Sequence, residues 1–234
     1  MQRNHSCQLI LALDIEDKKE AIDLVNSTGD QLEWIKVGLQ MFTKYGPDYI
    51  HELSNLGKKI FLDLKLHDIP NTVAKAIESL SALPIDMLTL HTCGGLEMMQ
   101  WAVKAQENSK PDLQLLGVTV LTSMDDNGLR QMDIRQSAAE RVVHLAGLAQ
   151  EAGMSGLVCS THEVVALKEK FGKQFKLVTP GVRPAGSATG DQKRIMTPGQ
   201  AREAGSDYIV VGRPIIQAAN PAEAVASITK ELTQ

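Results

Sequence analysis

The chain has 234 residues, and 24 Lys and Arg stand against 28 Asp and Glu, which gives a formal net charge of −4. Hydrophobic residues make up 43% of it, enough to bury a substantial core, so neither a disordered chain nor a small disulfide-stapled scaffold is expected. The mildly acidic balance gives no electrostatic reason to expect a nucleic acid or an anionic membrane as partner.

The cysteines and the amino-terminal segment indicate where such a chain would work. Cys7, Cys93 and Cys159 are too few and too far apart for a disulfide framework or a zinc cluster. An odd count without a CxxC motif fits a reducing compartment. The apolar run LILAL ends at Asp14 and is far too short to span a membrane. The sequence therefore predicts a soluble, cytoplasmic protein.

Short apolar runs alternate with longer amphipathic segments along the whole chain. The runs expected as strands are 8–14, 33–38, 59–66, 85–91, 113–119, 156–159, 176–179 and 208–211. Helical spacing marks 17–25, 71–80, 96–107, 138–149 and 163–170, and Thr197-Pro198 is typical of a further helix start. Eight strands alternating with helices favour a closed parallel (β/α)8 barrel over an open sheet. Because no linker interrupts the pattern, we expect residues 1–234 to form a single barrel domain.

The first two predicted strands each carry a charge toward one end of the barrel. The first ends in LALD, which places Asp14 at its carboxyl end. In the second, EWIKVGL, Lys36 lies on the face opposite Ile35 and Val37. Active sites of (β/α)8 barrels lie at the carboxyl ends of the strands, so both charges stand where chemistry is expected.

The third predicted strand, IFLDLKLHD, alternates leucines with polar residues. Its polar face, which should point into the barrel, carries Asp63, Lys65 and His67 beside Phe61. Residues two apart on a strand are separated by about 6.6 Å at the backbone, so the tips of Asp63 and Lys65 can meet. Asp68 follows where the strand gives way to a loop.

Any one of these charges is ordinary at a strand end, but the set is not. Burying an ion costs several kcal/mol unless an opposite charge pairs with it, and the alternating signs supply that pairing. Perturbed charge clusters concentrate at functional sites. We therefore interpret the inward charges of the first three strands as part of an active site.

Basic residues follow the last two predicted strands, in TPGVRP and VGRP. Loops at these positions of the barrel frequently bind phosphate. Gly212 lets the backbone approach an anion, and Arg183 and Arg213 bring two guanidinium groups to one place. The pattern predicts a site for a dianionic group. The Gly-, Ser- and Pro-rich segment 182–194 between them is interpreted as a functional loop at the mouth.

Two further positions stay open from the residues alone. His91 ends the fourth predicted strand on the same face as Thr89, so it either joins the polar site or is structural. Thr122, after the fifth strand, either touches a substrate or starts the next helix. Metal-ligand spacing, a dinucleotide-binding fingerprint and a nucleophile elbow are all missing from the sequence.

The motifs LALD, IKVGLQMF, FLDLKLHDIPNTV, VTVLTSM, TPGVRP, GDQKR and IVVGRPI run through essentially the whole chain. Together they resemble the orotidine 5'-phosphate decarboxylase family, in its bacterial form. The resemblance implies conversion of orotidine 5'-phosphate to uridine 5'-phosphate and CO2, the last step of de novo pyrimidine nucleotide (UMP) synthesis, without a cofactor or a metal.

The resemblance also implies roles for individual residues. Lys36, Asp63, Lys65 and Asp68 match the family's charged tetrad, in which Lys65 corresponds to the proton donor. Asp68 and Thr72 match residues that cross the interface of a homodimer. The other substrate contacts that it implies are Asp14 and Lys36 at the ribose, Thr122 and Gln192 around the pyrimidine and phosphate, and Arg183, Gly212 and Arg213 at the phosphate.

Three other functions share part of this pattern. A metal-dependent sugar-phosphate decarboxylase or aldolase of the same suprafamily has the Asp-x-Lys-x-x-Asp motif, but a metal-binding acidic residue where this chain has Lys36. An aldolase that forms a Schiff base on Lys65 needs a neutral amine, which Asp63 and Asp68 oppose. A nucleotide-binding protein without activity has little reason to keep so costly a charge cluster.

Overall fold

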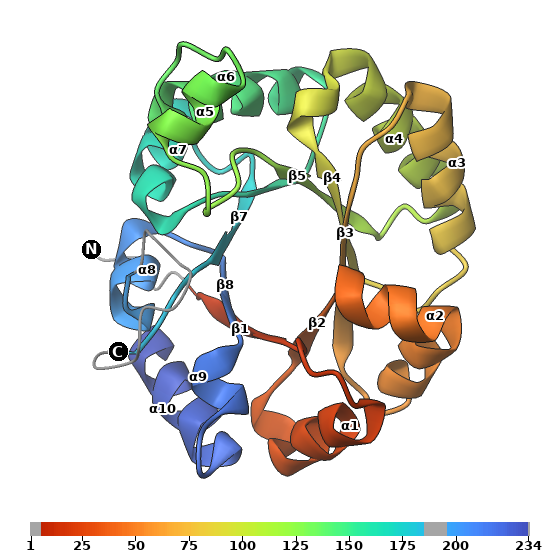
Figure 1. Ribbon diagram of the computed structural model, residues 1–234, viewed down its shortest axis with the longest axis vertical. Coiled ribbons are helices and arrows are strands. Elements are labelled where there is room, and N and C mark those ends of the chain that lie inside the picture. Colours follow the sequence, from red (N-terminus) through yellow and green to blue (C-terminus); the bar gives the residue numbers. More distant parts are fainter. Residues whose placement is uncertain (1–5, 185–195, 234) are drawn as a thin grey trace.

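The predicted barrel is present. The computed structural model describes residues 6–184 and 196–233, and its strands pair in parallel in chain order until β8 meets β1 and closes the ring (Figure 1). The strands are β1 (Gln8–Ala12), β2 (Trp34–Gly38), β3 (Lys59–Leu66), β4 (Met87–His91), β5 (Gln114–Val118), β6 (Gly156–Val158), β7 (Lys176–Pro180) and β8 (Tyr208–Val211). The expected (β/α)8 fold is confirmed, with strand ends that shift by up to two residues.

Helices surround the strands on the outside of the ring (Figure 1). They are α1 (Lys18–Ser27), α2 (Leu39–Ser54), α3 (Pro70–Leu80), α4 (Leu96–Ser109), α5 (Asp126–Gln131), α6 (Ala138–Glu151), α7 (Val164–Phe171), α8 (Pro198–Ala204), α9 (Arg213–Ile216) and α10 (Pro221–Thr233), with short 3-10 turns at Gly29–Gln31, Thr92–Gly94 and Thr161–Glu163. Over the described ranges, none of these helices is both long and apolar enough to cross a membrane.

Side chains in the sequence fix several helix starts. Asp17 accepts a hydrogen bond from the Glu20 N–H and caps α1. Thr197 caps α8 in a capping box with Gln200, and Pro198 occupies the first turn, where its missing N–H costs nothing. These caps lie where the sequence predicted the helices to begin.

Two separate apolar clusters follow from the alternation of side chains along the strands. The larger fills the space between strands and helices. The smaller lies inside the barrel and consists of Ile10, Ala12, Trp34, Phe61, Met87, Leu116, Val178 and Val210. Because this cluster fills the lower barrel, polar residues further along the same inward faces are left at the carboxyl ends of the strands.

Strand β3 departs from regular geometry just where its charges lie. Its register against β4 shifts between Leu62 and Leu66, and the backbone of Lys65 has a φ of +51°. The alternation still brings Asp63 and Lys65 together, but the prediction that His67 points into the barrel is wrong. His67 follows the end of the strand, is exposed, and packs its ring 5.6 Å from that of His91.

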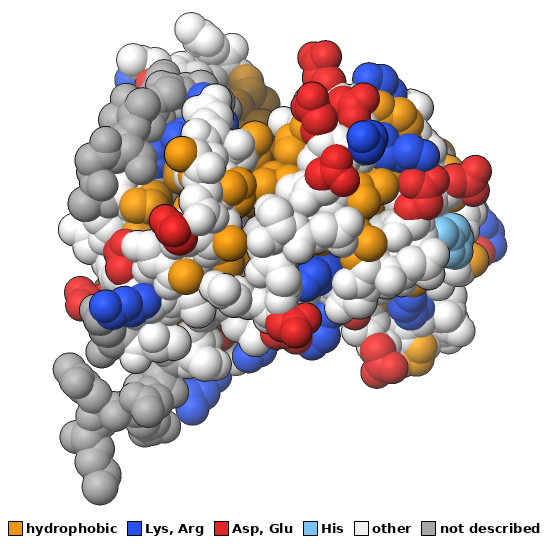
Figure 2. All heavy atoms as spheres, turned by 90° about the horizontal axis from the view of Figure 1, so that it is seen from below, with side chains coloured by type: hydrophobic (Ala, Val, Ile, Leu, Met, Phe, Trp, Pro, Cys, Tyr) orange, Lys and Arg blue, Asp and Glu red, His pale blue; other side chains and the backbone are white. Residues whose placement is uncertain are grey.

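The outer surface carries charges of both signs. Figure 2 shows acidic and basic side chains interspersed over one face, with hydrophobic side chains between them and no broad area of one sign. This face therefore offers no extended basic surface of the kind that binds a nucleic acid backbone.

Candidate active site

A cavity of about 600 Å³ opens at the carboxyl ends of the strands. Its polar lining consists of Asp14, Lys36, Asp63, Lys65, Thr122, Arg183, Arg213 and Gln217. Apolar side chains, among them Val118, Val158, Cys159 and Val182, form the rest of the wall. Charge interactions beside such an apolar wall are stronger than in bulk water.

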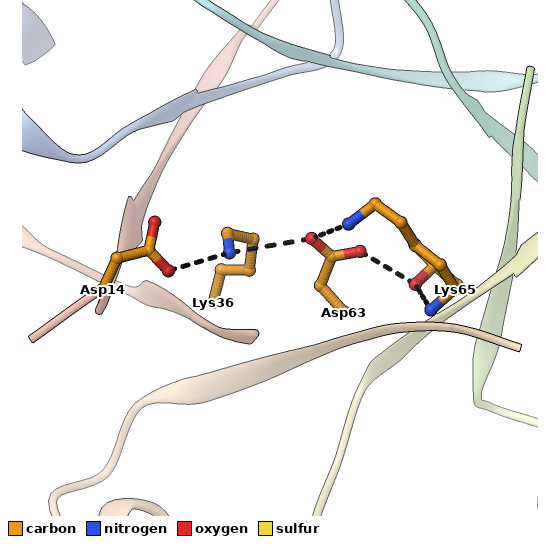
Figure 3. A network of polar contacts seen from close by, with 5 residues as sticks. Asp14, Lys36, Asp63 and Lys65 are labelled. Carbon is orange, nitrogen blue, oxygen red and sulfur yellow. Dashed lines mark hydrogen bonds and ion pairs between the residues drawn. The ribbon is translucent and has the colours of Figure 1, made fainter. Parts of the chain in front are cut away.

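Four of the polar residues form a row of alternating charge (Figure 3). Lys36 Nζ lies 3.4 Å from Asp14 Oδ1 and 3.6 Å from Asp63 Oδ2. Lys65 Nζ donates to the same Asp63 Oδ2 at 2.8 Å. One carboxylate oxygen of Asp63 therefore lies between two ammonium groups, which come from adjacent strands.

Asp63 is buried, with 9% of its surface exposed. Burial by itself raises the pKa of its carboxyl group, but Lys36, Lys65 and hydrogen bonds from Lys65 and Thr89 outweigh that effect. The pKa of Asp63 therefore lies below its ordinary value, so the carboxylate is charged and holds both lysines in place at neutral pH.

Positive charge gathers at the loops after β7 and β8. Arg183 is buried, with 8% exposed, and both Arg183 and Arg213 line the cavity beside Gly212. Burial and the charge of Arg213 lower the pKa of Arg183, a sign that an anion between the two groups would be stabilised. Gly212 precedes the short helix α9, and a Cβ there would lie 3.4 Å from Ala12 Cβ, an ordinary van der Waals contact.

The comparisons with known proteins agree with this geometry. The model of the orotidine 5'-phosphate decarboxylase / HUMPS family matches residues 7–228. The chain belongs to this family.

Similar proteins carry the family's name. The chain is 49% identical over 227 residues to an orotidine 5'-phosphate decarboxylase of Opitutus terrae, covering 97% of this chain and 99% of that one. It is 51% identical to the enzyme of Mannheimia succiniciproducens, with 97% of each covered. The crystal structure of the Lactobacillus acidophilus enzyme superposes with a TM-score of 0.87 at 39% identity, covering 97% of this chain and all of that one.

The structure brings together most residues that the sequence singled out. Asp14, Lys36, Asp63, Lys65, Thr122, Arg183, Gly212 and Arg213 all line the one cavity. Asp68 and Thr72 do not line it and are exposed at the surface of the chain. Gln192 lies outside the described residues, as does most of the segment 182–194.

Thr89 contacts the charged row, although sequence reasoning gave it no role there. It is fully buried on β4, and its hydroxyl contacts both Asp63 and the backbone of Lys65. Its position two residues before His91, on the inward face of a strand, was the available signal. A lone threonine on a strand is so often a packing residue that this signal carried little weight.

No group of three or more His, Cys, Asp and Glu within 6–184 and 196–233 is arranged to hold a metal ion. At the charged row itself, the Lys36 ammonium already lies between the carboxylates of Asp14 and Asp63. A divalent cation at the same place would be repelled by that lysine.

Proposed function

We propose that this chain catalyses the decarboxylation of orotidine 5'-phosphate to uridine 5'-phosphate and CO2, the last step of pyrimidine nucleotide (UMP) synthesis. The observation that carries the proposal is the Lys65 ammonium, held 2.8 Å from the buried Asp63 carboxylate in a cavity that also presents Arg183 and Arg213. A cationic acid and a phosphate site in one pocket are what this substrate requires.

Lys65 has two tasks in the reaction. When the bond between the pyrimidine ring and its carboxylate breaks, the electron pair stays on a ring carbon that delocalises it poorly. An ammonium group fixed beside that carbon stabilises the developing charge. Lys65 then gives the carbon a proton from Nζ, and the resulting neutral amine regains a proton from solvent. Neither task needs a cofactor.

Asp63 and Lys36 prepare Lys65 for these tasks. The Asp63 carboxylate favours the charged form of the lysine and fixes the direction of its side chain. Lys36, on the other side of the same oxygen, balances the charge of Asp63 and extends the row to Asp14. In the proposed complex Asp14 and Lys36 contact the ribose hydroxyls. A pre-formed array of this kind needs no rearrangement during the reaction.

The arginines bind the far end of the nucleotide. Arg183 and Arg213 would take the phosphate dianion together with backbone amides around Gly212, while Thr122 and Gln192 would contact the pyrimidine and phosphate. Binding energy from a group remote from the reacting carbon can assemble the site and raise the turnover rate.

The proposal includes a homodimer that completes each site. Asp68 lies two residues after the end of β3, and it is exposed together with Thr72 and Ile69, which is 66% exposed. In the proposed dimer, the second copy would cover the surface that carries Ile69. In the dimer Asp68 and Thr72 would enter the cavity of the partner subunit, next to Lys65 of that subunit.

The alternatives are weaker on specific grounds. A metal-dependent sugar-phosphate enzyme would need a cation where Lys36 contacts Asp14 and Asp63. A Schiff-base aldolase would need Lys65 neutral beside the Asp63 carboxylate, which favours its charged form. The single domain of residues 1–234 and the cytoplasmic location stay predictions from the sequence.

Absorbance of orotidine 5'-phosphate, followed with purified protein in excess chelator, tests the proposal. We expect the substrate to disappear and uridine 5'-phosphate to form at a rate that chelator does not change. Magnesium dependence would favour the sugar-phosphate enzyme. Trapping of the protein by borohydride with a carbonyl substrate would favour the aldolase, and tight binding of uridine 5'-phosphate without turnover would favour the silent binder.

A further inference from the structure

We propose that Thr89 is a positioning residue of the reaction, because its buried hydroxyl fixes the Lys65 backbone and the Asp63 carboxylate relative to each other. The inference rests on the proposed function, and it adds a residue that makes no contact with the substrate in that proposal.

The hydroxyl of Thr89 both donates and accepts a hydrogen bond. It donates to Asp63 Oδ1 at 2.9 Å and accepts from the Lys65 backbone N–H at 2.9 Å. The other oxygen of Asp63 accepts from Lys65 Nζ at 2.8 Å. These three hydrogen bonds close a ring that passes through Thr89, Asp63 and both ends of Lys65. Since a hydroxyl has only one proton, its donation to the carboxylate is fixed by the arrangement.

The backbone at Lys65 needs such support. Its φ of +51° lies in the left-handed region, which a residue with a Cβ adopts at an energetic cost. Between Leu62 and Leu66 the register of β3 against β4 shifts, so the regular ladder is interrupted around Lys65. The Thr89 hydroxyl takes the place of a carbonyl there and gives the Lys65 N–H a partner. The Thr89 side chain of β4 thus replaces one backbone hydrogen bond between β3 and β4.

Loss of this hydroxyl would remove the hydrogen bond that holds Asp63 Oδ1 and leave the part-buried Lys65 N–H without its partner. Both changes move Lys65 Nζ away from the position set by the ring of hydrogen bonds. A displacement of about 1 Å in a catalytic group can cost roughly 10²-fold in rate. The phosphate arginines lie on other loops, so substrate binding should suffer much less.

Three variants separate positioning from stability. Thr89→Val keeps the shape of the side chain and removes the hydroxyl, while Thr89→Ser keeps the hydroxyl. Thr92→Val is the matched control, because Thr92 is also fully buried and donates to the Val118 carbonyl at 2.9 Å, outside the charged row. Each is measured for kcat and KM with orotidine 5'-phosphate and for Tm. Thr89→Ala serves if the valine does not fold.

We expect Thr89→Val to lower kcat by about 10- to 100-fold with KM within about threefold of wild type, and Thr89→Ser to restore most of the rate. Thr92→Val should keep the wild-type kcat, even if its Tm falls as much as that of Thr89→Val. If wild type turns over the substrate and Thr89→Val keeps its kcat, this inference alone is wrong. The same holds if the kcat of both valine variants falls in step with Tm. A wild type without turnover overturns the proposed function as well.

Discussion

The Lys65 ammonium lies 2.8 Å from Asp63 Oδ2, on a residue only two positions further along the same strand. Because the Asp63 carboxylate neutralises it, the Lys65 ammonium can lie inside the barrel without adding net charge there. It also explains why the composition is uninformative, because charges that alternate in sign nearly cancel in the net value of −4. What distinguishes the protein is the order of these charges, from Asp14 after β1 to Lys36 on β2 and to Asp63 and Lys65 on β3.

The phosphate assignment predicts a selective loss of affinity in Arg213→Ala. A hydrogen bond to a charged group contributes about 1.5–3 kcal/mol, so the Kd of uridine 5'-phosphate should rise roughly 10- to 100-fold. Uridine, which lacks the phosphate, should bind with nearly unchanged affinity. Calorimetric titration of both ligands measures the difference.

Arg202→Ala is the matched control for this experiment. Arg202 lies in the last turn of α8, before β8, and pairs with Glu203 at 3.7 Å. It should leave both affinities unchanged. Equal losses for uridine and its phosphate in Arg213→Ala would contradict the assignment.

His91 should report the charge of Lys65. Burial, then His67 and Lys65, lower the pKa of His91 below its ordinary value of 6.5, while Asp63 opposes them. Lys65→Met should therefore raise the pKa of His91, because it removes one of the positive charges. NMR titration of the six histidines measures it, with the His91 signal assigned by His91→Gln. An unchanged pKa in Lys65→Met would contradict a charged Lys65 near that ring.

The same shift makes stability depend on pH. The unfolded chain takes up a proton at His91 at a higher pH than the folded protein does. Its contribution to stability is therefore present above about pH 6.5 and is lost as pH falls through the lower folded value. The Tm of His91→Gln should decline less between pH 7 and pH 5 than that of wild type. An equal decline would contradict the lowered pKa.

The shared site predicts complementation between two inactive variants. Lys65→Ala and Asp68→Ala homodimers should each have very little activity. In a mixed dimer, one site combines the intact Lys65 of one chain with the intact Asp68 of the other. Full subunit exchange should therefore restore about a quarter of wild-type activity, since half the dimers are mixed and each has one good site. Demonstrated exchange without any rescue would argue that Asp68 does not cross the interface.

The barrel could be predicted because its signals are local. Period-two apolar runs mark the strands, and residues such as Asp17 and Thr197 mark helix starts through hydrogen bonds to nearby backbone. The inward direction of Asp63 and Lys65 followed from the same alternation. The error at His67 arose because alternation was carried past the end of β3, where the chain no longer has strand geometry.

Side-chain contacts between different strands could not be predicted from the sequence. Nothing local to β3 indicates that Lys65 adopts a positive φ, and its N–H finds its partner on another strand, in the Thr89 hydroxyl of β4. The apolar wall around Val118 and Val158 likewise arises only when the ring closes. Asp68 and Thr72 are the reverse case. The resemblance implied that they complete a site across a dimer interface, whereas in the structure of a single chain they are only exposed surface residues.

Turnover of orotidine 5'-phosphate by Lys65→Ala, measured beside Lys173→Ala, tests the central claim most directly. Lys173 is an exposed lysine that follows α7 and lies outside the charged row. We expect Lys65→Ala to fold and dimerise, by circular dichroism and size-exclusion chromatography, and to lose roughly 10⁴-fold or more in kcat, since it removes both the cation and the proton donor. Lys173→Ala should match wild type. A folded Lys65→Ala that keeps more than about a tenth of the wild-type kcat would contradict the account.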